Sequence, residues 1–76
     1  MKSKLDDYII QKVKQKRIEK GLSQRAFADY TNLSQSFVAH VENPRFRAKY
    51  NICHINDFAH FFQCSLYDFI PEYPID

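Results

Sequence analysis

The side chains with the clearest chemical potential form a polar row beside two apolar positions. If residues 35–42 are helical, Val38 and Val41 lie three residues apart and face a core. The side chains left facing outward are those of Gln35, Ser36, Ala39 and His40. A glutamine amide can pair with N6 and N7 of adenine, which is worth ~1–3 kcal/mol of discrimination between bases. The row is therefore suited to contacting base edges.

The residues around this row predict two short helices joined by a tight turn, from Gln24 to Glu42. Ala28 is small at a point where one helix has to cross another closely. Asn32 tolerates the left-handed backbone that such a turn needs, and Ser34 follows as an N-cap for the second helix. The stretch therefore predicts a helix-turn-helix, whose second helix can enter the major groove of a duplex.

Length and composition limit the class of protein. The chain has 76 residues, so we expect one domain, residues 1–76, near the lower limit for a self-sufficient core. One Gly and three Pro favour helices with short joints over a turn-rich β fold. No apolar run reaches membrane-spanning length, and no signal peptide is evident. Because two cysteines do not make a disulfide framework, we expect a cytoplasmic, reduced protein without a membrane partner.

The net charge of +2 is unevenly distributed along the chain. Residues 1–25 hold eight Lys and Arg against three acidic residues, a balance of +5. The remainder holds three basic residues, Arg45, Arg47 and Lys49, against six acidic ones, a balance of −3. A basic half suits a polyanionic partner, although basic helix faces are often merely solvated.

Three more helices complete the predicted fold, which is all-α, compact and five-helical. A first helix follows a loose basic tail at residues 1–4 and ends at Gly21, a position typical of a left-handed C′ residue. Its expected apolar stripe consists of Leu5, Ile9 and Val13, flanked by Tyr8 and Ile10. Ser23 caps the second helix, and Pro44 stops the third.

The last two helices follow the same logic. Asn51 is expected to cap a helix over about 52–63. The expected core face of this helix is Ile52, Ile55, Phe58, Ala59 and Phe62. Ser65 is expected to cap a short fifth helix that ends at Pro71. The residues of this helix that turn inward would be Leu66, Phe69 and Ile70.

The run KRIEKGLSQRAFADYTNLSQSFVAHVEN, residues 16–43, resembles the XRE family, which has the phage lambda repressor and Cro-type fold. The residues that carry the likeness are Arg17, Gly21-Leu22-Ser23-Gln24, Ala28, Ser34 and Val41-Glu42-Asn43. The likeness extends over about 13–70. Two positions depart from the family pattern, because Asn32 and Pro44 stand where the family usually has Gly.

The resemblance implies sequence-specific binding of double-stranded DNA by a transcriptional regulator, and we expect repression by a homodimer on a palindromic site. Gln35 would be the principal reader of bases, with Ser36 and His40 beside it, while residues on both flanks would hold phosphates. The expected DNA-binding residues are Ser23, Gln24, Arg25, Ser34, Gln35, Ser36, Phe37, His40, Asn43, Arg45, Arg47, Lys49 and Asn51. The resemblance also implies a structural salt bridge between Arg17 and Glu42.

Each expectation has a simpler alternative. Gln35 and Ser36 could be ordinary polar surface, the loop charges could be solvated, and Phe37 could be a packing residue. The competing function is a protein-interaction module, such as an antitoxin or a co-regulator, that uses the aromatic C-terminal end. The rings of that end are Phe58, Phe61, Phe62, Tyr67, Phe69 and Tyr73, and most of them could equally fill the core.

Metal binding and catalysis find little support in the sequence. Cys53, Asp57 and His60 share a helical face, with His54 and Cys64 nearby, yet no CxxC is present and structural zinc sites use tighter spacing. A single Gly argues against a phosphate-cradling loop, and no nucleophile–base set stands out. We therefore expect no metal, no cofactor, no small-molecule ligand and no enzymatic activity.

Overall fold

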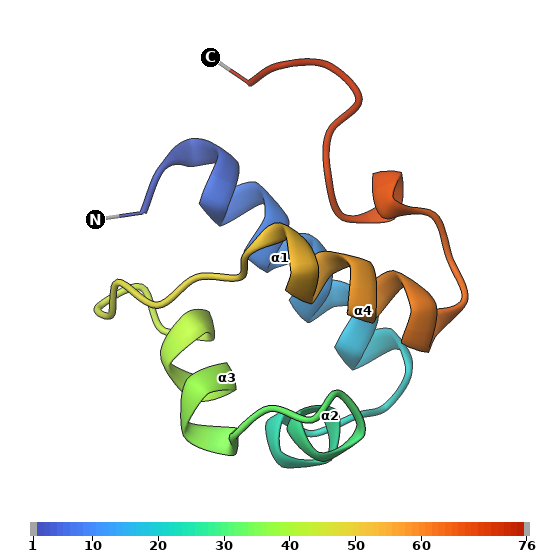
Figure 1. Ribbon diagram of the computed structural model, residues 1–76. Helices are drawn as coiled ribbons and strands as arrows, with labels where there is room; N and C mark the ends of the chain where they lie inside the picture. The colour runs from blue at the N-terminus through green and yellow to red at the C-terminus, as the bar shows by residue number, and fades with distance from the viewer. Residues whose placement is uncertain (1, 76) are drawn as a thin grey trace.

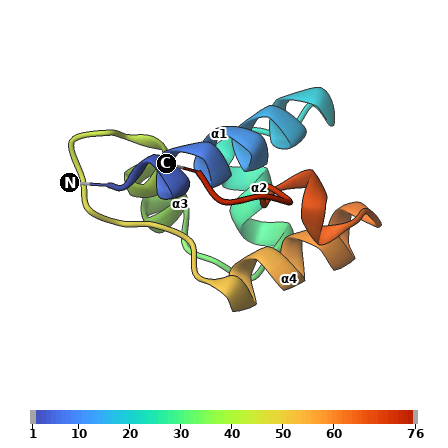
Figure 2. The same ribbon diagram turned by 90° about the horizontal axis from the view of Figure 1, so that it is seen from above.

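Within residues 2–75, which the computed structural model describes, the chain forms four α-helices and one 3-10 helix and contains no strand. The helices are α1 (Lys4–Glu19), α2 (Gln24–Tyr30), α3 (Gln35–Glu42), α4 (Ile52–Phe62) and η1 (Leu66–Asp68). Figure 1 shows α4 crossing α1, with α2 and α3 below them, and Figure 2 places α1 and α4 on opposite sides of the molecule. The all-α class is as predicted, and α2 and α3 form the predicted helix-turn-helix pair.

The expected fifth helix is wrong, because Leu66–Asp68 makes only a 3-10 turn. The Ser65 cap is formed as predicted, with its hydroxyl accepting from the Tyr67 N–H at 3.0 Å. Pro71 follows closely, and the α region is disfavoured for a residue that precedes a proline. Too few residues remain to extend a nucleated turn into an α-helix.

The core draws on every α-helix and on two residues outside them. Its fully buried members include Val13, Phe27, Val38, Ile55, Phe58 and Phe69. Phe27 of α2 lies at the centre, with its ring centroid 4.9 Å from that of Phe58 and 5.8 Å from that of Phe62. Tilted and stacked rings at these separations add attraction beyond the burial of apolar area. The helix-turn-helix is therefore supported directly by α4.

Three expected core positions are wrong. Leu5 is 42% exposed, Ile52 is 63% exposed, and Leu66 of η1 is 39% exposed. On α1 the buried face is formed by Ile10, Val13 and Arg17. A row of i+4 steps drifts by roughly 40° per step around an α-helix, so Leu5, two steps before Val13, has left the face that packs. Ile52 is the first residue of α4 and precedes the row at Ile55 that packs inward.

Three of the connections that follow helices contain a residue in the left-handed backbone conformation. Gly21, Asn32 and Gln63 have φ of 70°, 60° and 54°, and each follows a helix end. At the first joint the Leu22 N–H donates to the Arg17 carbonyl at 3.0 Å and the Gly21 N–H donates to Ile18 at 2.9 Å, which is the Schellman pattern. The left-handed residues at 21 and 32 were predicted, whereas the one at 63 was not.

The N-terminal arm is fixed, contrary to the expected loose tail over residues 1–4, of which Met1 lies outside the described residues. Ser3 caps α1 in a reciprocal capping box with Asp6, with hydrogen bonds of 3.0 and 3.1 Å. The Lys2 ammonium donates to the carbonyls of Val41 and Asn43, at 2.6 and 3.2 Å. Lys2 thus binds carbonyls that the end of α3 leaves without helical partners.

Candidate nucleic-acid interface

The turn between α2 and α3 sets the angle of the helix pair. The Leu33 N–H donates to the Ala28 carbonyl at 2.9 Å, across the left-handed Asn32. Ala28 is completely buried, as expected at a close helix crossing. The Ser34 hydroxyl accepts from the Phe37 N–H at 3.1 Å and so begins α3. The local sequence therefore specifies the geometry of the pair.

The outward face of α3 is polar and accessible. Gln35, Ser36 and His40 are exposed, Ala39 is half-buried, and Val38 and Val41 are completely buried. The helix carries one carboxylate, Glu42, whose side chain is 3% exposed and neutralised by an arginine. The exposed row therefore presents donors and acceptors without a negative charge that would repel a polyanion.

A buried polar cluster holds α3 in place. The Arg17 guanidinium donates from Nε and Nη2 to the two Glu42 carboxylate oxygens, at 2.9 and 2.8 Å. Its third nitrogen, Nη1, donates to the Leu22 carbonyl at 2.6 Å. The Gln24 amide donates to Glu42 Oε1 at 3.1 Å. The salt bridge implied by the family resemblance is thus present, and it links α1, α2 and α3 at one point.

At the start of α2, the three predicted phosphate contacts lie in different environments. Arg25 is exposed. The Ser23 hydroxyl is also exposed but accepts from the Ala26 N–H at 3.0 Å as the helix cap. Gln24 is half-buried, and its amide is held by Glu42. Arg25 therefore has the most freedom to reach outward.

The segment after α3 carries the other predicted basic contacts. Asn43 is half-buried and makes a turn, with its side-chain oxygen accepting from the Arg45 N–H at 3.0 Å and its carbonyl accepting from the Phe46 N–H at 3.1 Å. Arg45 and Arg47 are exposed. Lys49 is exposed and lies 3.6 Å from the Asp6 carboxylate. The turn therefore projects two arginines from a fixed base.

Phe46, between these two arginines, was missed by sequence reasoning. Its ring is 43% exposed and stacks on the His40 imidazole, with centroids 4.1 Å apart and planes 11° apart. The available signal was an apolar ring in an Arg-Phe-Arg run just after the second helix of the motif. Such a ring has no partner within its own segment, so its stacking on α3 could not be read from periodicity.

The start of α4 uses groups that were expected to face phosphate. The Asn51 N–H donates to Nδ1 of His54 at 3.0 Å, while the Asn51 side chain accepts from the His54 N–H at 2.9 Å. Asn51 is exposed, but its backbone N–H is therefore already bonded. Phe37 is half-buried and contacts the rings of Tyr50 and His54, which agrees with the packing interpretation of this residue.

Tyr50 places a hydroxyl in the core beside the polar cluster. The residue is 6% exposed, and its oxygen has no hydrogen-bond partner among the described residues. Burial raises the pKa of Tyr50 well above its usual value, and the nearby Glu42 charge adds to this while Arg17 opposes it. Tyr50 is therefore a neutral packing residue of the core.

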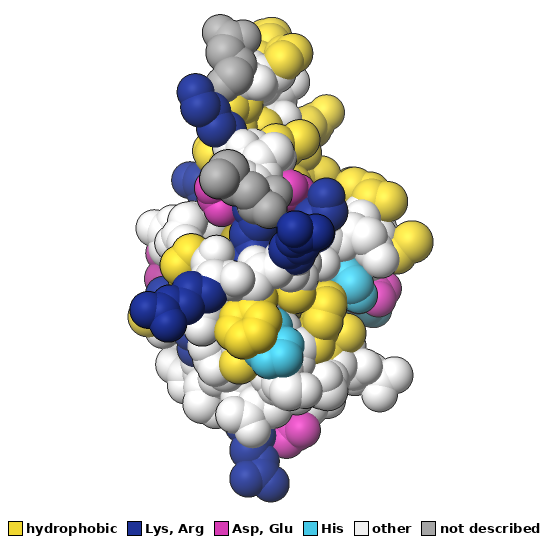
Figure 3. Space-filling view, turned by 90° about the vertical axis from the view of Figure 1, so that its left-hand side faces the viewer, with side chains coloured by type: hydrophobic (Ala, Val, Ile, Leu, Met, Phe, Trp, Pro, Cys, Tyr) yellow, Lys and Arg dark blue, Asp and Glu magenta, His cyan; other side chains and the backbone are white. Residues whose placement is uncertain are grey.

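The side of the molecule with the N-terminal arm and α3 is shown in Figure 3. Lys and Arg side chains lie at several places on this face and acidic ones are fewer, while histidine and hydrophobic side chains lie side by side near its middle. A face on which basic side chains outnumber acidic ones favours the approach of a polyanionic partner.

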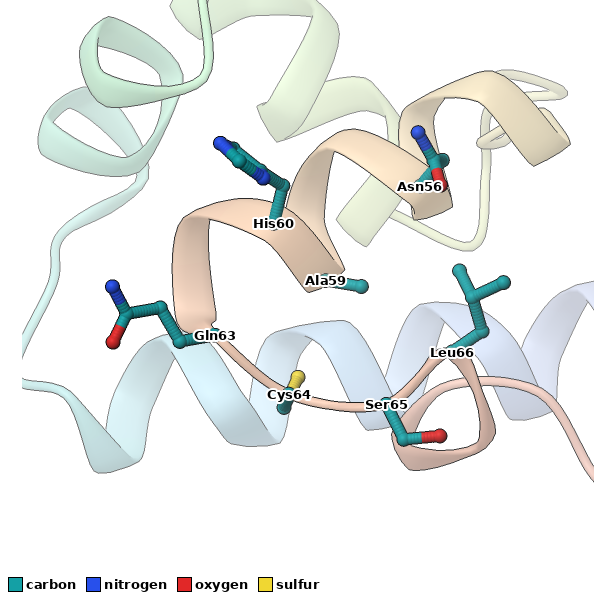
Figure 4. A pocket seen from close by; sticks show the side chains of 7 residues that line it. All are labelled: Asn56, Ala59, His60, Gln63, Cys64, Ser65 and Leu66. Atoms are coloured by element: carbon teal, nitrogen blue, oxygen red, sulfur yellow. The ribbon is translucent and has the colours of Figure 1, made fainter.

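The remaining surface carries hollows and scattered rings. An open hollow of about 720 Å³ lies against the end of α4, and in Figure 4 the His60 ring lies well apart from the Cys64 sulfur, although both residues line the hollow. Among residues 2–75, no three His, Cys, Asp or Glu side chains converge on a common point.

Of the C-terminal rings, Tyr67 and Tyr73 are exposed while Phe58 and Phe69 are buried. None of the described helices combines the length and the apolar content needed to cross a membrane.

Residues 13–45 match a family model described as HTH_3, helix-turn-helix. The crystal structure of a hypothetical transcription factor, NHTF, from Neisseria superposes with a TM-score of 0.72 at 23% identity, covering 87% of this chain and 74% of that one. No curated protein gives a significant match. Residues 13–45 are thus similar to the HTH_3 helix-turn-helix family, which confirms the predicted resemblance to XRE-type regulators over this range, and the Neisseria structure shares the fold.

Proposed function

We propose that this protein binds double-stranded DNA in a sequence-specific way and regulates transcription, with α3 in the major groove. The observation that carries this proposal is the exposed row of Gln35, Ser36 and His40 on a helix that the buried Arg17–Glu42 cluster fixes in place. A rigid reader loses little conformational entropy on binding. The HTH_3 match and the fold shared with a protein described as a transcription factor support the same assignment.

The exposed groups suggest a division of roles. Gln35, at the first position of α3, would pair with a base edge, and Ser36 would add a single hydrogen bond. Arg25 on one flank and Arg45 and Arg47 on the other would neutralise phosphates and set the position of the helix without reading sequence. Repression would follow from occupying the site, and a homodimer would place two copies of α3 about one helical turn apart on a palindrome.

The test begins with sequence enrichment of random duplexes by the purified protein, followed by titration of the enriched duplex at two salt concentrations. We expect affinity to fall steeply with salt, because phosphate contacts release counterions. Gln35→Ala should weaken binding to the enriched duplex by ~1–3 kcal/mol and leave binding to a scrambled duplex nearly unchanged. Arg47→Ala should weaken both and reduce the salt slope by about one.

Lys12→Ala provides a charge-matched control, because Lys12 lies on α1 with its ammonium 5.4 Å from the Tyr8 ring centroid. It removes the same charge as Arg47→Ala from a place outside the proposed interface, so both duplexes should bind as in wild type. A protein-interaction module would bind neither duplex in a salt-dependent manner, and that result would reject the proposal. Half-site spacing in the enriched sequences would report the dimer.

A further inference from the structure

One exposed aromatic ring beside α3 has no role in the core. Phe46 is 43% exposed and is absent from the buried cluster and from the residues packed against it. Its contact is the His40 imidazole, 4.1 Å away between centroids and nearly parallel. One face of the Phe46 ring is covered by this stack, while a large part of the ring stays accessible to a partner.

The ring is held in place by its backbone. The Asn43 side chain and carbonyl accept from the N–H groups of Arg45 and Phe46, so the turn that carries the ring is closed by two hydrogen bonds. The Asn43 carbonyl also accepts from Lys2. An exposed aromatic ring that is fixed in this way can act as an apolar contact point at a small entropic cost.

We infer that the Phe46–His40 pair contacts the C5-methyl group of a thymine in the major groove, which rests on the proposed function. His40 follows Gln35 by five residues, about 7.5 Å along the helix, or roughly two base-pair steps. Base edges in the major groove present mostly hydrogen-bond donors and acceptors, and thymine adds an apolar methyl group. A phenylalanine ring is suited to contact this methyl group. Arg45 and Arg47 flank the ring and would hold phosphates on either side of it.

The test uses the duplex enriched by the wild-type protein, in which each thymine is replaced singly by deoxyuridine. This replacement deletes the methyl group and keeps all Watson–Crick hydrogen bonds. We expect one position in each half-site at which wild-type affinity falls by about three- to fivefold, as for the loss of one buried methyl group. Phe46→Ala should bind the thymine and deoxyuridine forms of that position equally well.

Phe46→Leu and Arg47→Ala are the controls. The leucine variant retains an apolar contact and should still discriminate, whereas the arginine variant should bind every duplex more weakly and keep the full methyl dependence. A thermal melt of Phe46→Ala checks that the exposed position leaves the fold intact. Tight binding without a methyl-sensitive position, or methyl dependence that persists in Phe46→Ala, would overturn this inference and leave the proposed function standing. Absence of salt-dependent binding to any duplex would reject the proposed function as well.

Discussion

Among single residues, Glu42 has a buried carboxylate that depends on hydrogen-bond donors from two other helices. Its side chain is 3% exposed, and its carboxylate accepts hydrogen bonds from Arg17 and Gln24. A buried carboxylate is costly unless it is paired and hydrogen-bonded. The charge on α3 therefore requires that α1 and α2 keep their donors in position, which couples the orientation of α3 to the integrity of the domain.

We expect Glu42→Ala to lower the free energy of unfolding by ~3–5 kcal/mol, because it leaves the Arg17 charge buried without its partner. That loss is a large share of the stability of a domain of this size. Urea denaturation followed by circular dichroism measures it. If the alanine variant is unfolded, Glu42→Gln, which keeps the volume and one acceptor, should give a smaller but measurable loss.

Asp68→Ala is the matched comparison, because Lys16 and Asp68 form an ion pair at 3.2 Å with side chains 24% and 40% exposed. An exposed pair contributes ~0–1 kcal/mol, so this variant should unfold close to the wild type. Equal losses in the two variants, or an unchanged Glu42→Ala, would contradict the idea that burial gives the Arg17 pair its importance.

The sequence predicted the residues of the site unevenly. Exposure of Gln35 and Ser36 followed from helical periodicity, because the buried partners Val38 and Val41 fix the opposite face. The Lys2 contact with α3 could not be predicted, since it joins residues 39 positions apart through a side chain and a backbone carbonyl. The Phe46 stack depended likewise on the path of the turn at Asn43.

At the scale of elements, the helix ends carry most of the specification. Each α-helix begins at a Ser or Asn cap, and the joints at Gly21, Asn32 and Gln63 use left-handed residues to reverse direction. Capping residues can be predicted from a sequence because few residue types have a side chain that accepts a hydrogen bond from the free N–H groups of a first helical turn. Gln63 gave no such signal, since glutamine is not typical of a left-handed site.

This mismatch predicts a stabilising substitution. Gln63→Gly should raise the free energy of unfolding by ~0.5–1 kcal/mol, because glycine adopts φ near 54° without the steric cost that a side chain meets there. Asn32→Gly should have a smaller effect, since asparagine already tolerates the left-handed region. Chemical denaturation of both variants measures the difference.

Gln11→Gly is the control for the intrinsic effect of glycine. Gln11 is exposed in the middle of α1, where glycine costs ~1 kcal/mol relative to a good helix former. The same replacement should thus stabilise at 63 and destabilise at 11. Destabilisation at both positions would show that the left-handed conformation at the end of α4 carries no strain that glycine can relieve.

The predicted elements were correct where capping residues set their ends, and wrong where the length of the run or the packing against other elements sets the structure. The bounds of α2, α3 and α4 followed caps and stops that are visible in the sequence. The expected fifth helix failed because the run between Ser65 and Pro71 is too short to extend beyond a 3-10 turn. The stripe of α1 was misplaced because a row of i+4 steps drifts around an α-helix, so Ile10 and not Leu5 shares the packed face with Val13 and Arg17.

At the scale of the whole molecule, the N-terminal arm closes the structure around the proposed DNA-binding surface. Lys2 binds the end of α3, and Asp6 of the first helix lies 3.6 Å from Lys49 in the segment that follows α3. The first and middle parts of the chain are thus joined on the face seen in Figure 3. Contacts far apart in sequence therefore stabilise the turn that carries Arg45, Phe46 and Arg47.

The arm makes this closure sensitive to acid through Asp6. Burial raises the pKa of its carboxyl, but hydrogen bonds from Ser3 and the Lys49 charge outweigh burial and hold the pKa below the ordinary 3.8. A carboxyl whose pKa is lower in the folded state stabilises the fold at pH values above 3.8, and this contribution is lost as the pH falls through the pKa of the folded state.

We therefore expect Asp6→Ala to lower the Tm by a few degrees at pH 7, as for the loss of ~1 kcal/mol. The difference in Tm from wild type should shrink below pH 3.8. Asp7→Ala is the control, because it removes an equal charge from the same turn but leaves the capping box intact, and it should lower the Tm less at pH 7. A Tm difference between Asp6→Ala and wild type that stays constant down to pH 2 would contradict the role of the Asp6 charge.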